Sequence, residues 1–429
     1  MGLHQRGLAM IERILKSSFL KLTSIVFVGN LLSQLIIFLA FILFARFFDK
    51  TEIGIYTVFI SLSVLLAIPA TGRYELAVML PKEQRDATGL LKLALTLSGI
   101  FSVVLFVLLY LIPFQIYFER LERITELILL LPLGVFFMAA FQSFILYYNK
   151  LNKFKLNAVL KFVQAALMLS LSLLLANRFG YKAYALVLAW VLSQAALFFF
   201  YLGYLLFKQE AHSISDLRSL AATFKRYPTV SLIGNFVNTF SVELPNYFIP
   251  VFWGASVQTL YAYGARVAAM PRNFIGSAIG DVFYKSSSKL AQEDPKALLV
   301  HLQKVTRTLL LFSTCTYLVG ILTANFLFPI VFGETYAEAV PYFQWMAIAS
   351  IFLFVQSPIS VISDVLVKLQ APLIFNLVSI VCKIGVLSFA AYYLESPVHM
   401  IALYAIVTAI LSLFWIFYLQ KMTKDSLIS

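Results

Sequence analysis

Long apolar stretches alternate with short polar ones along almost the whole chain. Each stretch is continuous and about 20 residues long, the length of helix that crosses ~30 Å of hydrocarbon. Because backbone hydrogen bonds must close inside the membrane, continuous runs favour helices over a β-barrel. The pattern predicts an all-α integral membrane protein with about twelve spans: 22–44, 54–80, 93–112, 125–148, 156–177, 183–207, 229–253, 257–283, 306–326, 341–363, 372–394 and 399–420.

Composition agrees with this class. The 429 residues are 61% hydrophobic and 12% charged, and the mean hydropathy is +0.89. A soluble domain of this length needs more charge to cover its surface. The longest loops between the predicted spans, 208–228 and 284–305, are too short to hold a catalytic domain, so an enzyme is not expected.

The net charge of +13 is explained by where the basic residues lie. If the N-terminus is cytoplasmic, 23 of the 33 Lys and Arg lie in or close to cytoplasmic segments and six lie in outer loops. Such a bias follows the positive-inside rule and favours contact with anionic lipid headgroups. Both termini are therefore predicted to be cytoplasmic, with membrane lipids as partners and no nucleic acid.

No cofactor, metal site or catalytic constellation is visible in the sequence. The two cysteines, Cys315 and Cys382, lie in apolar runs, and the four histidines lack metal-ligand spacing. The first apolar run is too long for a cleaved signal peptide. Met10 remains an alternative start to Met1.

Weak internal similarity indicates that the chain contains two related halves. Asn30 and Tyr56 recur as Asn235 and Tyr261 at an offset of 205 residues, and a Gln-Ser pair occurs in both the fourth and the tenth span. These matches pair span n with span n+6, the pattern of two parallel six-helix lobes. We expect an N-terminal lobe over 1–207, a cytoplasmic linker over 208–228 and a C-terminal lobe over 229–429.

Several basic residues lie inside predicted spans, where an ionisable group costs roughly 2.5–3.5 kcal/mol on insertion scales. Such groups usually face a wet cavity or one another. The candidate cationic substrate-binding residues are Arg73, Arg266, Arg272 and Lys383. An alternative stays open for Arg73, and equally for Glu75 and Asp281, because side chains this close to a helix end can reach water by snorkelling.

The polar residues of the seventh and eighth spans follow helical spacing. Asn235 and Asn238 share one stripe of the seventh span, and Tyr263, Arg266 and Asn273 lie near one face of the eighth. Their expected role is to line a polar cavity, with helix packing as the alternative for the Asn stripe. Pro271 should kink the eighth span beside the arginines.

Glu243 is the acidic group predicted to balance one of these charges. It lies ten residues from the outer end of the seventh span, and Arg266 lies nine from the outer end of the next, so both sit at similar depth. We predict that they face each other as an ion pair. Glu243 is also the one candidate for coupling transport to an ion.

These residues belong to segments that resemble Wzx-like polysaccharide flippases of the multidrug/oligosaccharidyl-lipid/polysaccharide (MOP) exporter superfamily. The matching features are the Leu-Pro of the seventh span, the Phe-Trp-Gly-Ala turn and the Y-x-x-x-x-R from Tyr261 to Arg266. RYELAVMLPK (73–82) and FGETYAEAVPYF (332–343) also resemble family segments. The chain departs at Gln258-Thr259 and at Asp281, so Asp281 is not carried over as a site residue.

The resemblance implies two six-helix lobes around a central cavity that opens alternately to the two sides of a bacterial inner membrane. The implied cargo is an undecaprenyl-pyrophosphate-linked oligosaccharide for O-antigen or other surface polysaccharide of the lipopolysaccharide kind. A polysaccharide polymerase and chain-length machinery are candidate partners. Intramembrane Arg suits this cargo because a guanidinium binds phosphate oxygens bidentately.

Two other functions are alternatives to a flippase. A cation-coupled multidrug exporter of the same superfamily should carry an acid deep in its first lobe, and the first span has none. A membrane glycosyltransferase or polysaccharide polymerase should carry clustered acids on a long external loop, and the predicted outer loops are short. The sugar unit, ion coupling and oligomeric state are left open by the sequence.

Overall fold

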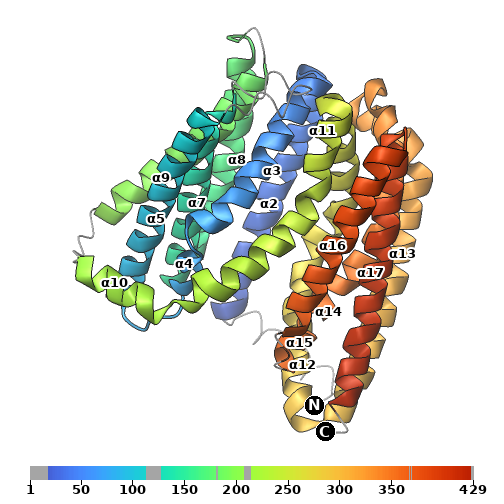
Figure 1. The fold of residues 1–429 in the computed structure, drawn as a ribbon. Coiled ribbons are helices and arrows are strands. Elements are labelled where there is room, and N and C mark those ends of the chain that lie inside the picture. The colour runs from blue at the N-terminus through green and yellow to red at the C-terminus, as the bar shows by residue number, and fades with distance from the viewer. Residues whose placement is uncertain are drawn as a thin grey trace, which may run out of the picture. The chain divides into compact units, whose positions relative to one another are not determined.

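The computed structural model describes residues 18–112, 127–179, 182–206, 214–366, 368 and 370–426. The two candidate start residues, Met1 and Met10, lie outside these ranges. Helices account for almost all of the described residues, and no strand occurs among them. The long helices of each compact unit run side by side (Figure 1). The expected all-α membrane fold is therefore confirmed.

The first compact unit holds the described residues up to Phe47, from Leu62 to 112, and from 127 to Ile233. Its closest helix pairs are α2 with α8, α8 with α9, and α5 with α7. The helices that lie wholly in it are α2 (Ser18–Phe47), α4 (Tyr74–Ala77), α5 (Gln84–Leu111), α7 (Leu131–Lys150), α8 (Phe154–Ala176), α9 (Ala183–Leu206), α10 (Ile214–Thr223) and the π-helical turn η3 (Tyr227–Ser231).

The second unit holds Phe48–Ser61 and the described residues from Gly234 onward. In it α14 packs between α13 and α17, and α17 also packs on α16. Its elements are α11 (Leu232–Pro271), the π-helical turn η4 (Arg272–Gly276), α12 (Ser277–Glu293), α13 (Pro295–Phe332), the 3-10 turn η5 (Glu334–Ala339), α14 (Val340–Ile359), α15 (Ile362–Val365), α16 (Gln370–Tyr393) and α17 (Pro397–Asp425).

Helix α3 (Lys50–Ala70) is divided between the units, because its residues up to Ser61 pack with the second unit. The Tyr247 hydroxyl donates to the Ser61 carbonyl oxygen at 3.0 Å. Lys50 forms a 2.7 Å ion pair with Glu338 of η5, and its carbonyl oxygen accepts a hydrogen bond from the Thr259 hydroxyl. The start of α3 is thus tied to α11 and η5.

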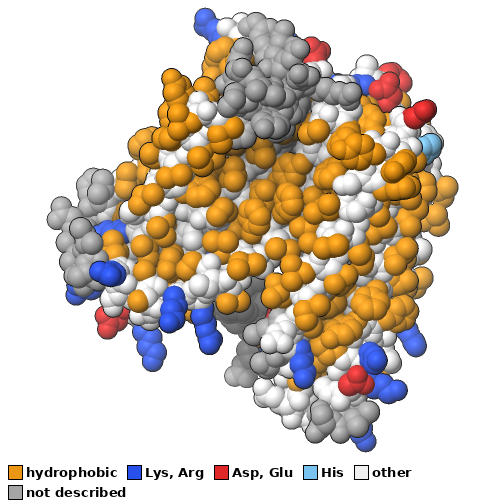
Figure 2. Space-filling view, viewed as in Figure 1, with side chains coloured by type: hydrophobic (Ala, Val, Ile, Leu, Met, Phe, Trp, Pro, Cys, Tyr) orange, Lys and Arg blue, Asp and Glu red, His pale blue; other side chains and the backbone are white. Residues whose placement is uncertain are grey.

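Nine helical segments among the described residues are long and apolar enough to cross a membrane. Many of their large hydrophobic side chains are not covered by protein, as expected for side chains that face lipid. Figure 2 shows hydrophobic side chains along the lengths of the helices, with Lys and Arg near their ends. The chain is a multi-pass membrane protein.

The two long cytoplasmic loops predicted from the sequence contain helix. Helix α10 lies in the first, and α12 and α13 occupy nearly all of the second. Asp294 separates α12 from α13, and its carboxylate accepts a hydrogen bond from the Ala297 amide at 3.1 Å as an N-cap. Pro295 fits the first position of α13 because it needs no donor there. The hydropathy pattern misses these segments because they are amphipathic rather than apolar.

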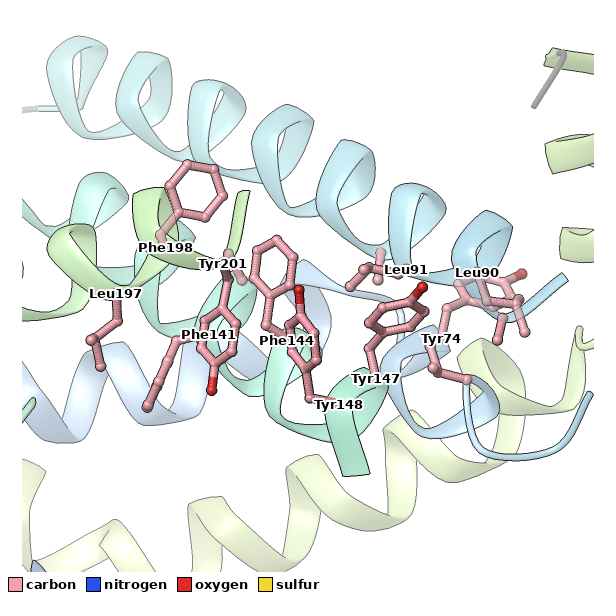
Figure 3. Packing of buried hydrophobic residues seen from close by; sticks show 14 of the residues in the cluster. Tyr74, Leu90, Leu91, Phe141, Phe144, Tyr147, Tyr148, Leu197, Phe198 and Tyr201 are labelled. Carbon is pink, nitrogen blue, oxygen red and sulfur yellow. The ribbon is translucent and has the colours of Figure 1, made fainter. Parts of the chain in front are cut away.

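An aromatic cluster forms a core of the first unit (Figure 3). Tyr148 stacks on Tyr201 with ring centroids 4.8 Å apart, and Phe144 stacks on Tyr201 at 5.2 Å. The amphipathic α10 packs against this cluster, and the Tyr74 hydroxyl donates to the Ala221 carbonyl oxygen at 3.1 Å. The cluster therefore anchors the region that follows α9 to the first unit.

Candidate substrate-binding site

The backbone of α11 places the arginine of the Y-x-x-x-x-R segment. Gly254 adopts φ 83°, so α11 consists of two helical segments that meet at this turn. The second segment carries Tyr261 to Arg266 and packs through Gly264 on the start of α14, where a Cβ would stand 2.6 Å from the Phe343 amide nitrogen. This close packing fixes the position of Arg266.

Arg266 is partly buried in the second unit, near two phenols and one carboxylate. Tyr56 of α3, Tyr263 and Glu243 all act on it electrostatically. Tyr263 is fully buried, and its ring lies 4.5 Å from that of Tyr336. Tyr263 therefore packs in an aromatic core beside Arg266.

Glu243 belongs to a chain of hydrogen bonds that joins the two segments of α11. The Asn246 side-chain amide donates to the Glu243 carboxylate at 2.6 Å, and the Gln258 amide donates to the Asn246 side-chain oxygen at 2.6 Å. The structure thus places Glu243 within electrostatic reach of Arg266 and also fixes its carboxylate through an amide.

Lys383 and Arg272 form a second basic group in the same unit. Lys383 is only 8% exposed, and its ammonium donates to the Ser241 hydroxyl at 3.3 Å. The ammonium lies 5.6 Å from the centroid of the Tyr404 ring. Arg272 acts electrostatically on Lys383, Tyr404 and Tyr317. The structure therefore brings Arg272 and Lys383 together with two phenols and one hydroxyl.

Arg272 owes its position to a change in helix type. Pro271 ends α11, and the chain continues as the π-helical turn η4. Proline lacks the amide proton that a regular α-helix needs, and single π turns occur frequently at functional sites. The side chain of Arg272 then runs past Gly276, where a Cβ would stand 3.5 Å from the Arg272 Cγ.

Arg73 belongs to the first unit and has an acidic partner. It adopts a left-handed backbone conformation (φ 61°) between the spanning helices α3 and α5, and its guanidinium lies 3.2 Å from the Glu75 carboxylate of α4. Burial raises the pKa of Glu75, and the Thr71 hydroxyl and the Arg73 charge offset only part of that effect. The structure therefore presents Arg73 and Glu75 as a buried ion pair.

The predicted polar lining residues differ in burial. Asn235 is partly buried, whereas Asn238 and Asn273 are exposed. Sequence reasoning missed Ser241 and Tyr404, the partners of Lys383. Ser241 lies about 120° around the helix from Asn235, so the predicted stripe did not indicate it. Within the described ranges, no group of three or more His, Cys, Asp or Glu could hold a metal ion.

Comparison with solved structures shows the fold. The chain is similar to the lipid II flippase MurJ in an inward closed conformation, with a TM-score of 0.74, 15% identity and coverage of 95% of this chain and 91% of that one. It is similar to a multidrug resistance MATE family transporter of the MOP superfamily in an outward-facing conformation, at a TM-score of 0.58, 13% identity and 94% and 95% coverage. A MOP superfamily transporter from Pyrococcus furiosus matches at 0.61, with 12% identity and 94% and 96% coverage.

The chain thus has the multi-pass helical fold of these solved transporter structures. The model of the polysaccharide biosynthesis protein family matches residues 43–341. The chain belongs to this family. No curated protein sequence matches it.

Proposed function

We propose that this protein is a flippase for undecaprenyl-pyrophosphate-linked oligosaccharides in the bacterial inner membrane. Family membership points to surface polysaccharide biosynthesis, and the fold is that of MOP transporters and of a lipid II flippase. The observation that carries the proposal is the set of three basic side chains, Arg266 of α11, Arg272 of η4 and Lys383 of α16, which all belong to one unit and lie in predicted spans. Fixed positive charge at that depth suits an anionic headgroup.

Transport would proceed by alternating access between two six-helix lobes, with both termini in the cytoplasm. The diphosphate would lie against the basic groups of a central cavity, and hydroxyl and amide side chains would replace the water lost by the sugars. The polyprenyl tail can stay in the lipid. The flipped product would then be available to a polysaccharide polymerase and its chain-length machinery.

A cation-coupled multidrug exporter is the second candidate, because a multidrug resistance MATE transporter shares the fold. It would need an acidic group that takes up a proton or sodium ion, and Glu243 is the candidate for that role. Its neighbours are an amide and a nearby arginine. A carboxylate held in this way is better suited to balancing Arg266 than to binding a small organic cation.

Lipid translocation in proteoliposomes tests the proposal. A fluorescent undecaprenyl-pyrophosphate oligosaccharide should cross the bilayer with the protein and not in empty liposomes. A fluorescent neutral glycolipid with the same tail is the matched control and should not cross the bilayer. Proton- or sodium-driven efflux of small cations, without translocation of any diphosphate lipid, would overturn the flippase proposal and support the exporter.

A further inference from the structure

Helix α10 and the turn that follows it have an apolar side and a basic side. Apolar side chains at helical spacing pack against the aromatic cluster of the first unit: Leu220, Ala221, Phe224 and Tyr227. The exposed side chains of the same segment include three cations, Arg218, Lys225 and Arg226, which we call the basic strip. Because the apolar side packs on protein, the segment presents its basic strip to the surroundings.

The aromatic cluster indicates the depth at which α10 lies. The cluster takes Tyr147 and Tyr148 from the last turn of α7, and Tyr201 from near the end of α9. Tyrosine is enriched at membrane–water interfaces, because its ring is apolar and its hydroxyl is polar. Helix α10 packs on this cluster and on α5 (Figure 1). It therefore lies at the level of the lipid headgroups.

The charges of the basic strip are not balanced by the protein. None of its three cations forms an ion pair within the ranges that the structure describes. Other cations of the first unit have partners in it. The Lys150 ammonium donates to the Met79 carbonyl oxygen at 3.3 Å, and the Lys153 ammonium lies 4.1 Å from the centroid of the Tyr204 ring. The basic strip thus offers cations that the protein itself does not use.

Unpaired cations at headgroup depth match the charge of anionic phospholipids. The sequence predicts that this end of the first unit is cytoplasmic, and the cytoplasmic leaflet carries a negative surface potential. Each Lys or Arg close to such a surface strengthens association about fivefold. We propose that the basic strip binds the phosphate groups of anionic phospholipids and thereby holds α10 on the membrane surface. This role goes beyond the flippase function and does not depend on the transported molecule.

Quenching by nitroxide-labelled lipids tests the proposal at α10 itself. In the full-length protein with Cys315→Ala and Cys382→Ala, Ala222→Cys gives an exposed attachment point on α10 for a fluorophore. The protein is reconstituted in phosphatidylcholine vesicles. These contain a minor share of either phosphatidylglycerol or phosphatidylcholine with a nitroxide near the headgroup end of one acyl chain. Phosphatidylglycerol should quench the fluorophore more strongly, and the excess should fall as the salt concentration rises.

Substitutions in the basic strip should remove this excess stepwise. Arg218→Gln, Lys225→Gln and Arg226→Gln should each weaken the association of phosphatidylglycerol with α10 about fivefold, and the triple change about a hundredfold. Arg178→Gln is the matched control and should leave the excess unchanged. Arg178 is an exposed cation of the same unit and follows the end of α8 that lies away from α7. Because all these side chains are exposed, the variants should melt at the wild-type temperature in neutral detergent.

Three outcomes would overturn the proposal. Equal quenching by the two lipids in wild type would show no preference for anionic headgroups. Absence of quenching by either lipid would show that α10 lies away from the membrane surface. An excess that persists in the folded triple variant would show that other cations bind the lipid. Since these vesicles contain no undecaprenyl lipid, the result is independent of whether the protein transports one.

Discussion

Gly264 of α11 packs directly against the backbone of Phe343 in α14, where a Cβ at position 264 would stand 2.6 Å from the Phe343 amide nitrogen. Real Cβ atoms do not approach backbone this closely, so the contact requires glycine. Since Arg266 lies two residues further along the same helix, this contact couples the packing of α11 on α14 to the position of a charged side chain.

Gly264→Ala should therefore lower the free energy of unfolding by about 1–3 kcal/mol, because the added methyl group forces the two helices apart. Thermal unfolding of the detergent-solubilised protein measures the change. Gly385→Ala in α16 is the matched control: no heavy atom would lie within 4 Å of its Cβ, and its stability should be unchanged or slightly raised. Equal loss in both variants would show that the Gly264 contact is not responsible.

The effect on stability of removing the Glu243 charge should depend on whether the Arg266 charge is present. Glu243→Gln alone leaves Arg266 without its acidic neighbour and should destabilise the protein by about 1–3 kcal/mol, as when a charged hydrogen-bonding partner is removed. The double change Glu243→Gln, Arg266→Gln should cost less than the single change, because no unbalanced charge remains. A double-mutant cycle on melting temperatures checks this. Equal damage from the single and double changes would exclude the pairing.

Glu75 should make stability depend on pH. Burial raises its pKa in the folded protein above its ordinary value. The folded state therefore binds the proton of the Glu75 carboxyl more strongly than the unfolded state does. The stability that this proton contributes is fully present below the ordinary pKa of Glu and is lost as pH rises through the pKa of the folded state. As pH rises above about 4, wild type should therefore lose stability relative to Glu75→Gln, until Glu75 is ionised in the folded protein as well.

Melting temperatures of the two proteins across this range measure the difference. Arg73→Gln is a second variant to compare with wild type. Removing the cation raises the pKa of Glu75 further and should move the loss of stability to higher pH. Parallel pH profiles of wild type and Glu75→Gln would show that Glu75 does not titrate differently in the two states.

The sequence predicted the fold class well because membrane helices leave a strong one-dimensional signal. Continuous apolar runs indicated the spans, and Pro271 marked the point where the backbone changes to a π-helical turn. The hydropathy pattern did not predict amphipathic helices such as α10 and α12, because their apolar faces are too narrow to raise the mean hydropathy. Where the two lobes begin and end stays a prediction.

The candidate site was only partly accessible to sequence reasoning. Intramembrane Arg and Lys stand out by type, so Arg266, Arg272 and Lys383 could be named. Their partners could not, because Ser241 and Tyr404 meet Lys383 only through tertiary packing of α11, α16 and α17. A tyrosine or serine in an apolar helix carries no signal of its own. The contacts of Lys383 therefore required the three-dimensional structure.

The aromatic cluster of the first unit offers a comparison of two neighbouring phenols. Tyr201 and Tyr148 are both fully buried and stack on each other. The Tyr201 hydroxyl donates to the Asn157 side-chain oxygen at 2.7 Å. The Tyr148 hydroxyl, by contrast, has no hydrogen-bond partner in the ranges that the structure describes. Figure 3 shows both rings in the same layer of the cluster.

Tyr201→Phe should lower the free energy of unfolding by about 1–3 kcal/mol, because it leaves a buried acceptor on Asn157 without its donor. Tyr148→Phe should be neutral or stabilising, since it removes a buried hydroxyl that has no partner among the described residues while the ring stacking remains. Thermal unfolding of both variants, in the same detergent, measures the difference. If both changes cost the same, ring packing rather than the Tyr201–Asn157 hydrogen bond would account for the loss. A selective loss in Tyr201→Phe would establish that a polar contact inside an aromatic core holds α8 to α9.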